Sequence, residues 1–356
     1  MPSSFDPILT VDAQAAIVRD LILSQPLRPV TSGVTGVILG AGLGRRMDNL
    51  GRLLPKPLLP VLNCSLLNWS LARMHSYGIR NIIVNTHHNC DLFESLPSMV
   101  SDLGVKLDLR KEDVLSGPFG GVLTCSRAAR KTDDLLVLTG DGMFEVEIES
   151  LLDAHRRTDS ELTMGVASVA DGSRYGVLEV AADGAVVAMQ EKPAGIGQVD
   201  TASCGIYFVA PRLIDRMNRN VLPLDWIDVV EVALSEGRRV SATLIEGWMD
   251  AGTPADLLTI NLTMLSPTKL ALVAKSMATA GGSVWLQGSV YGLDTALLKG
   301  TVLIGDGAIL GPGAKLVNSI VGSKGTIGPN AEVRNSVVLP GATIAANATV
   351  VDVVVG

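Results

Sequence analysis

Short apolar runs alternate with longer segments of helical periodicity between residues 34 and 245. The runs are rich in Val, Ile and Leu, which favour strands, whereas the longer segments repeat their apolar residues every three or four positions. Strands that alternate with helices are typical of an α/β domain in which helices cover a mostly parallel sheet. We expect strands at 35–39, 80–85, 104–109, 135–139, 161–169, 204–209 and 239–245, and helices near 65–77, 119–130, 147–157 and 225–236.

Two further segments flank or interrupt this alternation. Residues 176–180 and 185–190 predict a hairpin around Ala182-Asp183-Gly184, a turn suited to positive φ. Residues 1–33 form an extension that precedes the α/β domain. A stripe of apolar residues predicts a helix over 11–24, which Pro26 ends. We expect this helix to pack against the body of the protein or against a partner subunit.

The C-terminal segment follows a different period. Asn318-Ser319-Ile320-Val321 recurs seventeen residues later as Asn335-Ser336-Val337-Val338, and hexapeptides such as Ile327-Gly328-Pro329-Asn330-Ala331-Glu332 fill the interval. One inward apolar residue in six predicts three-sided coils of a β-helix. Acyltransferases with such coils generally need a catalytic histidine, and none follows His155, so we expect a structural or oligomer-forming role. The predicted organisation is an extension (1–33), a catalytic domain (34–264), a linker (265–283) and a β-helix (284–356).

Composition narrows the class of protein. The 356 residues include 29 Lys and Arg against 36 Asp and Glu, a net charge of −7, and no segment gathers basic residues. This balance argues against nucleic acid or an anionic membrane as the main partner. We find neither a transmembrane pattern nor a secretory signal, so we expect a cytoplasmic protein. Its scattered cysteines are expected to remain reduced rather than to form disulfides or a zinc site: Cys64, Cys90, Cys125 and Cys204.

The segment from Val34 to Leu59 contains the most informative motif. An apolar run enters a glycine-rich turn, two arginines follow at once, and a lysine between two prolines comes ten residues later. Glycines let backbone N–H groups approach an anion closely, and the cations add fixed positive charge. The pattern indicates a triphosphate-binding site formed by Gly40, Ala41, Gly42, Gly44, Arg45, Arg46 and Lys56.

A dinucleotide-binding turn is the main alternative for this motif. That turn requires G-x-G-x-x-G at the start of a helix and an acidic residue at the end of the next strand. Here the third glycine comes one residue early, and Arg45 stands in its place. The next predicted strand is followed by Thr86-His87-His88, without an acid. The sequence therefore favours the triphosphate site.

These motifs resemble the signatures of the sugar nucleotidyltransferases, the NDP-sugar pyrophosphorylases. The resemblance rests on the glycine turn with Arg46-Met47, on Pro55-Lys56-Pro57-Leu58, and on Gly247 to Pro254, which is similar to the family's W-x-D-x-G-T-P. It covers about residues 34–264 by motif and 284–356 by fold. The fold it implies is a mixed, mostly parallel Rossmann-like sheet followed by a left-handed parallel β-helix.

The resemblance also implies the roles of individual residues. Asp141, after the strand at 135–139, and Asp250 would share one Mg²⁺, an ion that prefers a few carboxylate oxygens together with substrate phosphates. Arg46, Lys56 and Lys192 would be catalytic, with Lys192 on the phosphate of the sugar. The remaining expected contacts are Glu112 and Gly117 near the base, Glu191 on sugar hydroxyls, and Gly176 and Cys204 in the sugar pocket.

The implied reaction joins an NTP and a sugar 1-phosphate and releases pyrophosphate. The β-helix and Asn85-Thr86-His87-His88 look closest to mannose-1-phosphate guanylyltransferases, which favours GTP. Arg45, Pro118-Phe119 and Cys204 depart from the family pattern, so thymidylyl, uridylyl or adenylyl transfer to glucose 1-phosphate and a cyclitol 1-phosphate acceptor remain alternatives. A non-catalytic regulatory homologue is a further alternative, although the charged motif residues are retained. We expect a homo-oligomer, because end coils expose apolar edges.

Overall fold

The structure, a computed structural model, describes residues 17–28, 33–217, 222–278 and 282–356. Residues 17–24 are helical, as expected for the extension, and the first part of the predicted helix, 11–16, lies outside the described residues. The chain forms two compact units. The sheet unit comprises residues 27–42 and 73–250, and the coil unit comprises 43–72 and 251–356 with the N-terminal segment.

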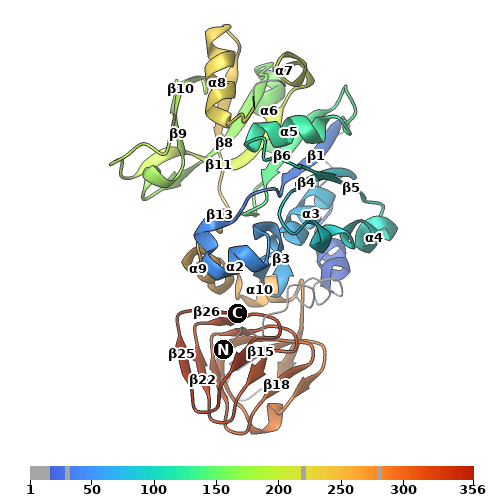
Figure 1. The fold of residues 1–356 in the computed structure, drawn as a ribbon, viewed down its shortest axis with the longest axis vertical. Coiled ribbons are helices and arrows are strands. Elements are labelled where there is room, and N and C mark those ends of the chain that lie inside the picture. The colour runs from blue at the N-terminus through green and yellow to red at the C-terminus, as the bar shows by residue number, and fades with distance from the viewer. Residues whose placement is uncertain (1–16, 29–32, 218–221, 279–281) are drawn as a thin grey trace. The chain divides into compact units, whose positions relative to one another are not determined.

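The sheet unit is built on a nine-stranded sheet (Figure 1). Its strands follow the order β10-β9-β11-β6-β1-β4-β5, and β8 pairs with both β11 and β12. The pairs among β6, β1, β4 and β5 are parallel, whereas β11 is antiparallel to β6, β8 and β9. The strands are β1 (Val34–Leu39), β4 (Asn81–Thr86), β5 (Lys106–Lys111), β6 (Asp134–Thr139), β8 (Leu162–Val169), β9 (Gly176–Val180), β10 (Val186–Glu191), β11 (Val199–Val209) and β12 (Val240–Leu244).

Helices cover this sheet because its central strands are apolar on both faces. α5 (Pro118–Ser126) packs on β1 and β4, α6 (Glu149–Arg157) on β8 and β12, and α8 (Trp226–Ser235) on β10 and β12. Phe119 of α5 meets Trp226 of α8 edge to face at 5.3 Å, and Trp226 stacks on Tyr207 of β11 at 3.8 Å. Shorter helices are α4 (Leu96–Val100) and α7 (Pro211–Arg216).

The predicted strands and helices of this unit are present, with shifts of a few residues at their ends. The helix expected near 119–130 ends at Ser126, and the strand expected at 204–209 begins already at Val199. The sequence did not predict β7 (Gly142–Phe144) and β13 (Trp248–Asp250), which form a separate antiparallel pair. Each has only three residues, too few for a period of two to be recognised.

The coil unit begins with the segment that carries Arg46 and Lys56. Two 3₁₀ turns, η1 (Arg45–Met47) and η2 (Lys56–Leu58), flank α2 (Asp48–Leu53), and a hairpin of β2 (Pro60–Val61) and β3 (Cys64–Ser65) follows. α3 (Leu66–Ser76) runs from this unit into the sheet unit. The chain returns at residue 251 and forms α9 (Pro254–Met264) and α10 (Pro267–Leu270), the latter inside the predicted linker.

Residues 282–356, here called the coil, wind through three parallel sheets. Strand pairs repeat at a spacing of seventeen residues, as in Leu303–Ile320–Val337–Val354, which is consistent with a parallel β-helix. β14 (Lys275–Ala278), also within the predicted linker, pairs with the first coil strand antiparallel. The coil strands are β15 (Gly282–Gln287), β16 (Val290–Tyr291), β17 (Leu297–Gly305), β18 (Ala308–Leu310), β19 (Lys315–Val317), β20 (Ile320–Val321), β21 (Thr326–Ile327), β22 (Glu332–Arg334), β23 (Val337–Val338), β24 (Thr343–Ile344), β25 (Thr349–Val351) and β26 (Val354–Val355).

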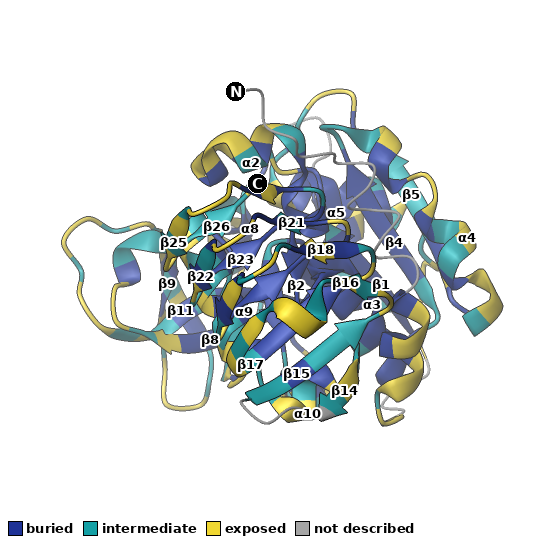
Figure 2. Cartoon of the chain, turned by 90° about the horizontal axis from the view of Figure 1, so that it is seen from below, coloured by how far each residue is buried: buried dark blue, intermediate teal, exposed yellow. Residues whose placement is uncertain are grey.

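One face of the coil is buried on both sides. Val321 and Val338 belong to the apolar core inside the coil. Their neighbours Ile320 and Val337 point to the opposite face of the same strands, yet they are buried as well. Figure 2 shows the strand β23, to which Val337 belongs, in the colour of buried residues. This outer face is covered within the coil unit, where α9 contacts β26 and Asn63 bonds to β20. The repeated Asn-Ser-apolar-apolar motif therefore serves both packing inside the coil and docking onto its own chain.

Candidate functional site

The glycine turn begins where β1 ends. Gly40 N donates to the backbone oxygen of Asn85 at 3.2 Å and to its side-chain Oδ1 at 2.8 Å, which fixes the turn against β4. Gly42 is exposed, and a Cβ built on it would meet no atom within 4 Å. Packing within the protein therefore does not require glycine at position 42. An open, Cβ-free turn at the carboxyl end of a parallel strand suits close approach by an anion.

Glu112 is buried in a small polar network beneath this turn. Its carboxylate accepts hydrogen bonds from Asn85 Nδ2 and from the backbone N and Oγ of Ser116, the latter two at 3.1 and 2.6 Å. A Cβ at Gly121 would lie 2.5 Å from Asn85 Nδ2, so glycine is needed for this contact. Sequence reasoning cited Asn85 only within the Asn85-Thr86-His87-His88 segment and did not select it as a site residue. In the structure it links the Gly40 turn to Glu112.

Gly117 is the residue before α5 and has φ +78°. A Cβ there would lie 2.3 Å from the carbonyl oxygen of Leu224. The loop before α8 is bound to the same segment, because Leu224 N donates to Ser116 O and Phe119 N donates to Leu224 O. Both the backbone conformation and the close packing therefore require glycine at position 117. Its predicted place beside the base remains a prediction.

The two candidate metal ligands lie at neighbouring strand ends: Asp250 ends β13, and Asp141 lies immediately before β7. β13 pairs with β7 so that Asp250 stands opposite Gly142, the residue after Asp141. Gly247 lies just before β13 and helps to bring it beside β7. Its φ is +82°, and its carbonyl oxygen accepts a hydrogen bond from Glu145 N at 2.7 Å. Both aspartates are partly exposed. The structure thus brings together two acids that are far apart in the sequence.

An arginine and two aromatic residues surround Asp250. Arg174 Nη2 lies 3.7 Å from Asp250 Oδ2. Tyr175 packs edge to face on Trp248 at 5.4 Å, so the segment before β9 is attached to β13. Sequence reasoning did not select Arg174, whose only signal was its place next to Tyr175-Gly176. Its charge offsets part of the repulsion between the two carboxylates.

The donor set of this pair suits magnesium better than a transition metal. Among the described residues, no group of three or more His, Cys, Asp and Glu side chains could hold a metal ion by itself. Mg²⁺ is commonly held by one or two carboxylates and takes its other oxygens from phosphates and water. Asp141 and Asp250 fit that requirement.

The hairpin of β9 and β10 supplies the candidate sugar residues. Glu191 pairs with Gly176, and a Cβ at Gly176 would lie 3.0 Å from Glu191 Oε2. Lys192, at φ +47°, donates its backbone N–H to Tyr175 O at 3.0 Å and forms an ion pair with Glu191. Gly176, Glu191 and Lys192 are therefore brought together.

Strand β11 places Ser203 beside this group and holds Cys204 in the interior of the sheet unit. Ser203 lies beside Gly176 and bonds through Oγ to Tyr207 Oη at 3.0 Å, although sequence reasoning did not select it. Cys204 is fully buried, with Sγ 3.2 Å from where a Cβ of Gly165 would lie. Burial raises the pKa of the Cys204 thiol, which stays protonated. This geometry lends no support to the prediction that the Cys204 side chain lines a sugar pocket.

Arg46 and Lys56 belong to the coil unit. Gly44, at φ +61°, turns the chain into η1, where Met47 is fully buried and Arg45 and Arg46 are exposed. Lys56 is buried, and its Cγ would lie 3.5 Å from a Cβ of Gly44. Gly44 and the P-K-P-L segment are thus packed together within this unit. The two arginines thus present their positive charge to solvent, whereas the positive charge of Lys56 is shielded from it.

The second half of the tryptophan motif has a structural role. Thr253 precedes α9, and its Oγ1 accepts from Asp256 N at 3.2 Å, which caps the helix. Pro254 occupies the first turn, where its missing N–H costs nothing. The motif therefore combines a candidate metal ligand with a helix start.

Among the described residues, no helix is long and apolar enough to cross a membrane.

Comparisons with known proteins find similar chains. The chain is 27% identical over 295 residues to a mannose-1-phosphate guanylyltransferase of Mycobacterium tuberculosis, which covers 82% of this chain and 80% of that protein. It is 25% identical over 292 residues to a glucose-1-phosphate thymidylyltransferase of Streptomyces griseus, with 80% of each covered. A solved Bacillus anthracis structure in complex with a sucrose shares the fold, with a TM-score of 0.58, 23% identity, and 65% of this chain and 94% of that chain covered.

A family model gives the decisive match. The model of the nucleotidyl transferase family covers residues 35–266, which include every candidate site residue and extend over more than half of the chain. The expected family is thereby confirmed. The chain belongs to the nucleotidyl transferase family.

Proposed function

We propose that the protein transfers a nucleotidyl group from an NTP to a sugar 1-phosphate and releases pyrophosphate. The observation that carries the proposal is the register of β7 and β13, which sets Asp250 opposite the residue after Asp141. A pair of acids at the edge of a nucleotide-binding sheet is what a reaction between two phosphates requires. The relatives named above, which act on mannose and glucose 1-phosphates, support the same class of acceptor.

The proposed reaction is a displacement at phosphorus. An oxygen of the sugar 1-phosphate forms a bond to the α-phosphorus of the NTP, and the bond from that phosphorus to the bridging oxygen breaks as pyrophosphate leaves. The protein aligns the reactants and neutralises their charge rather than forming a covalent bond. When bound by Asp141 and Asp250, Mg²⁺ would supply charge to phosphate oxygens of both reactants.

Three cations of the chain have distinct roles in this proposal. Exposed Arg46 binds the leaving phosphates, and buried Lys56 stabilises the charge that grows near the α-phosphate. Lys192, beside Glu191 and Gly176, binds the phosphate of the acceptor. Glu191 and Ser203 are placed to bond to sugar hydroxyls. The open turn at Gly40 to Gly42 receives the triphosphate of the nucleotide.

A screen for pyrophosphate release tests the substrates. Each of GTP, ATP, UTP, CTP and dTTP is paired with mannose, glucose and cyclitol 1-phosphates in the presence of Mg²⁺. We expect GTP with mannose 1-phosphate to give the highest rate, and a preference for dTTP with glucose 1-phosphate would select the alternative thymidylyl transfer. No release from any pair would favour the non-catalytic homologue.

A binding measurement tests the triphosphate contact separately. Arg46→Ala should weaken NTP binding in the presence of Mg²⁺ by about tenfold or more, because charge-assisted bonds to phosphate are strong. Isothermal titration measures this directly. Equal NTP affinity of wild type and Arg46→Ala would contradict the role given to Arg46.

The last part of the proposal concerns the coil and the assembly of the protein. We propose that the coil is a left-handed β-helix and that its end contributes to a cytoplasmic homo-oligomer. Val351 at this end is exposed, and end coils that lack a cap expose unpaired strand edges. Val351→Lys should lower the oligomeric mass measured by light scattering. A monomeric wild type, or an unchanged mass, would contradict this part.

A further inference from the structure

The turn between β2 and β3 has an unfavourable backbone conformation. Leu62 has φ +51° and Asn63 has φ +62°. Asn tolerates this left-handed region, but Leu rarely adopts it because its Cβ crowds the following carbonyl. Both residues are buried. A strained conformation of this kind persists only where the surroundings hold it, and such positions cluster at functional sites.

Two side chains from distant segments hold this turn. Asn261 of α9 accepts from Leu62 N at 2.9 Å through Oδ1 and donates to Pro60 O at 3.0 Å through Nδ2. Gln287 of β15 donates to Leu62 O at 3.1 Å through Nε2 and accepts from Asn63 Nδ2 at 2.8 Å through Oε1. Each amide thus uses both its donor and its acceptor on the turn, which fixes its position and orientation.

A third contact joins the turn to the coil. Asn63 Nδ2 also donates to the carbonyl oxygen of Val321 at 3.1 Å. Val321 belongs to β20, in the middle of the buried coil face. The turn is therefore attached to two layers of the coil, at Gln287 in β15 and at Val321 in β20, which are separated by β17. This attachment gives the turn the rigidity of a packed repeat rather than that of a surface loop.

The same turn follows Lys56 closely. Leu59 N donates to Lys56 O at 3.0 Å, and Leu66 N donates to Leu59 O at 3.1 Å, so the chain from η2 to the end of the hairpin is bonded continuously. Leu58, Leu59 and Leu62 are fully buried. A shift of the hairpin would therefore shift the backbone that carries Lys56.

We propose that Gln287 and Asn261 are positioning residues for nucleotidyl transfer. They hold the Leu62–Asn63 turn and, through it, the backbone of Lys56, so that the coil forms part of the catalytic machinery in addition to any role in assembly. This inference rests on the proposed function, in which Lys56 stabilises charge near the α-phosphate. A misplacement of about 1 Å at such a group can cost about 100-fold in rate.

The test compares Gln287→Ala with a control in the same coil. Asn347→Ala removes an exposed side chain whose contact with Asn330 lies within the coil. In steady-state pyrophosphate release by the full chain, Gln287→Ala should lower kcat about tenfold and change KM for either substrate much less, because the geometry of the transition state is affected most. Asn347→Ala should behave as wild type. Gln287→Glu, which keeps one acceptor for Asn63, should recover part of the loss.

A second variant and a physical measurement make the outcome independent of folding losses. Asn63→Gly keeps the positive φ but removes both side-chain bonds to the coil, so it should lower kcat as Gln287→Ala does. Hydrogen exchange of the backbone amides of residues 56–66 should become faster in both variants and not in Asn347→Ala.

The results that would overturn the inference are distinct. An unchanged kcat in Gln287→Ala and Asn63→Gly, an equal loss in Asn347→Ala, or a loss without faster exchange at residues 56–66 would each contradict it. Wild type that releases no pyrophosphate would instead refute the proposed function, and any faster exchange would then report only the structural contact. Lys56→Ala marks the loss expected when the lysine itself is removed.

Discussion

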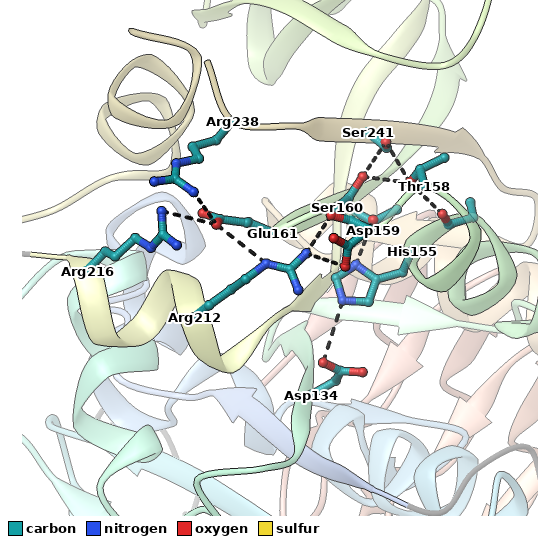
Figure 3. A network of polar contacts seen from close by, with 12 residues as sticks. Asp134, His155, Thr158, Asp159, Ser160, Glu161, Arg212, Arg216, Arg238 and Ser241 are labelled. Atoms are coloured by element: carbon teal, nitrogen blue, oxygen red, sulfur yellow. Dashed lines mark hydrogen bonds and ion pairs between the residues drawn. The ribbon is translucent and has the colours of Figure 1, made fainter. Parts of the chain in front are cut away.

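The sheet unit has two clusters of charged residues at opposite ends of its strands, and the two clusters differ in the signs of their charges. At the end of β6, the fold brings like charges together, since Asp250 stands opposite the neighbour of Asp141. At the start of β8, the fold surrounds buried Glu161 with arginines (Figure 3). Arg212, Arg216 and Arg238 each lie within 3.4 to 3.5 Å of Glu161 Oε1.

This difference separates a site from a structural network. Opposite charges that contact one another at the start of β8 need no further ligand, and Asp159 pairs with Arg212 at 2.9 Å in addition. Asp141 and Asp250 carry like charges, and Arg174, 3.7 Å from Asp250, offsets only part of their repulsion. Such locally unfavourable arrangements are expected at functional sites. A cluster of charged residues therefore indicates a functional site when its charges have the same sign, and a structural network when opposite charges contact one another.

The largest expected effect comes from the acids at the end of β6. Asp141→Asn or Asp250→Asn should lower Mg²⁺-dependent turnover at least about 100-fold, because one of the two anionic ligands is lost. Thermal unfolding should change little, since Asp250→Asn gives up the pairing with Arg174 while either variant relieves repulsion between the acids. Asp134→Asn, at the other end of the same strand, is the matched control and should stay near wild type in turnover. Full activity of both site variants at saturating substrate would contradict the metal assignment.

Glu161→Gln should act on stability and not on chemistry. It removes a buried carboxylate that three partly exposed arginines share, so the free energy of unfolding should fall by roughly 2 kcal/mol after allowance for solvent screening. Urea unfolding measures the loss. Glu236→Gln, an exposed partner of Arg238, should cost less than about 0.5 kcal/mol. Reduced kcat of folded Glu161→Gln would indicate that the network also serves the site.

Lys192→Ala should raise KM for the sugar 1-phosphate about tenfold, which is the expected cost of one charge-assisted bond to phosphate. The KM for NTP should change much less. The variant Lys106→Ala removes an exposed lysine at the start of β5 and serves as the control. Initial rates at varied acceptor concentration distinguish the two. An unchanged KM for the acceptor in Lys192→Ala would remove this lysine from the proposed phosphate contact.

The smallest expected effect concerns pH. Burial, aided by the nearby Arg80, lowers the pKa of His75 below 6.5, so the unfolded chain binds the proton more readily. The stability that His75 contributes is present above pH 6.5 and is lost as the pH falls through its lowered pKa in the folded protein. His75→Gln should reduce the loss of stability between about pH 7.5 and pH 5. Urea unfolding at both values checks this, and an equal loss in the variant would refute it.

The sequence by itself determined the elements and the motifs. The alternation of strands and helices from residue 34 to 245, the turn at Gly184 and the seventeen-residue repeat depend on local periodicity, which side-chain direction imposes on any strand or helix. The glycine turn, Lys56 and the two aspartates could be selected because their residue types suit phosphate and metal chemistry. The family that they indicated is confirmed by the match over residues 35–266.

Only the tertiary structure decided which of these residues meet and which way they face. The pairing of β7 with β13, the antiparallel course of β11 and the bonds of Asn85 to Glu112 join segments that no local pattern connects. Cys204 lies inside the sheet unit because the packing around Gly165 leaves room for its side chain there. Long-range register and side-chain burial follow from the packing of the whole unit, since a strand's own period fixes its two faces but not its partners.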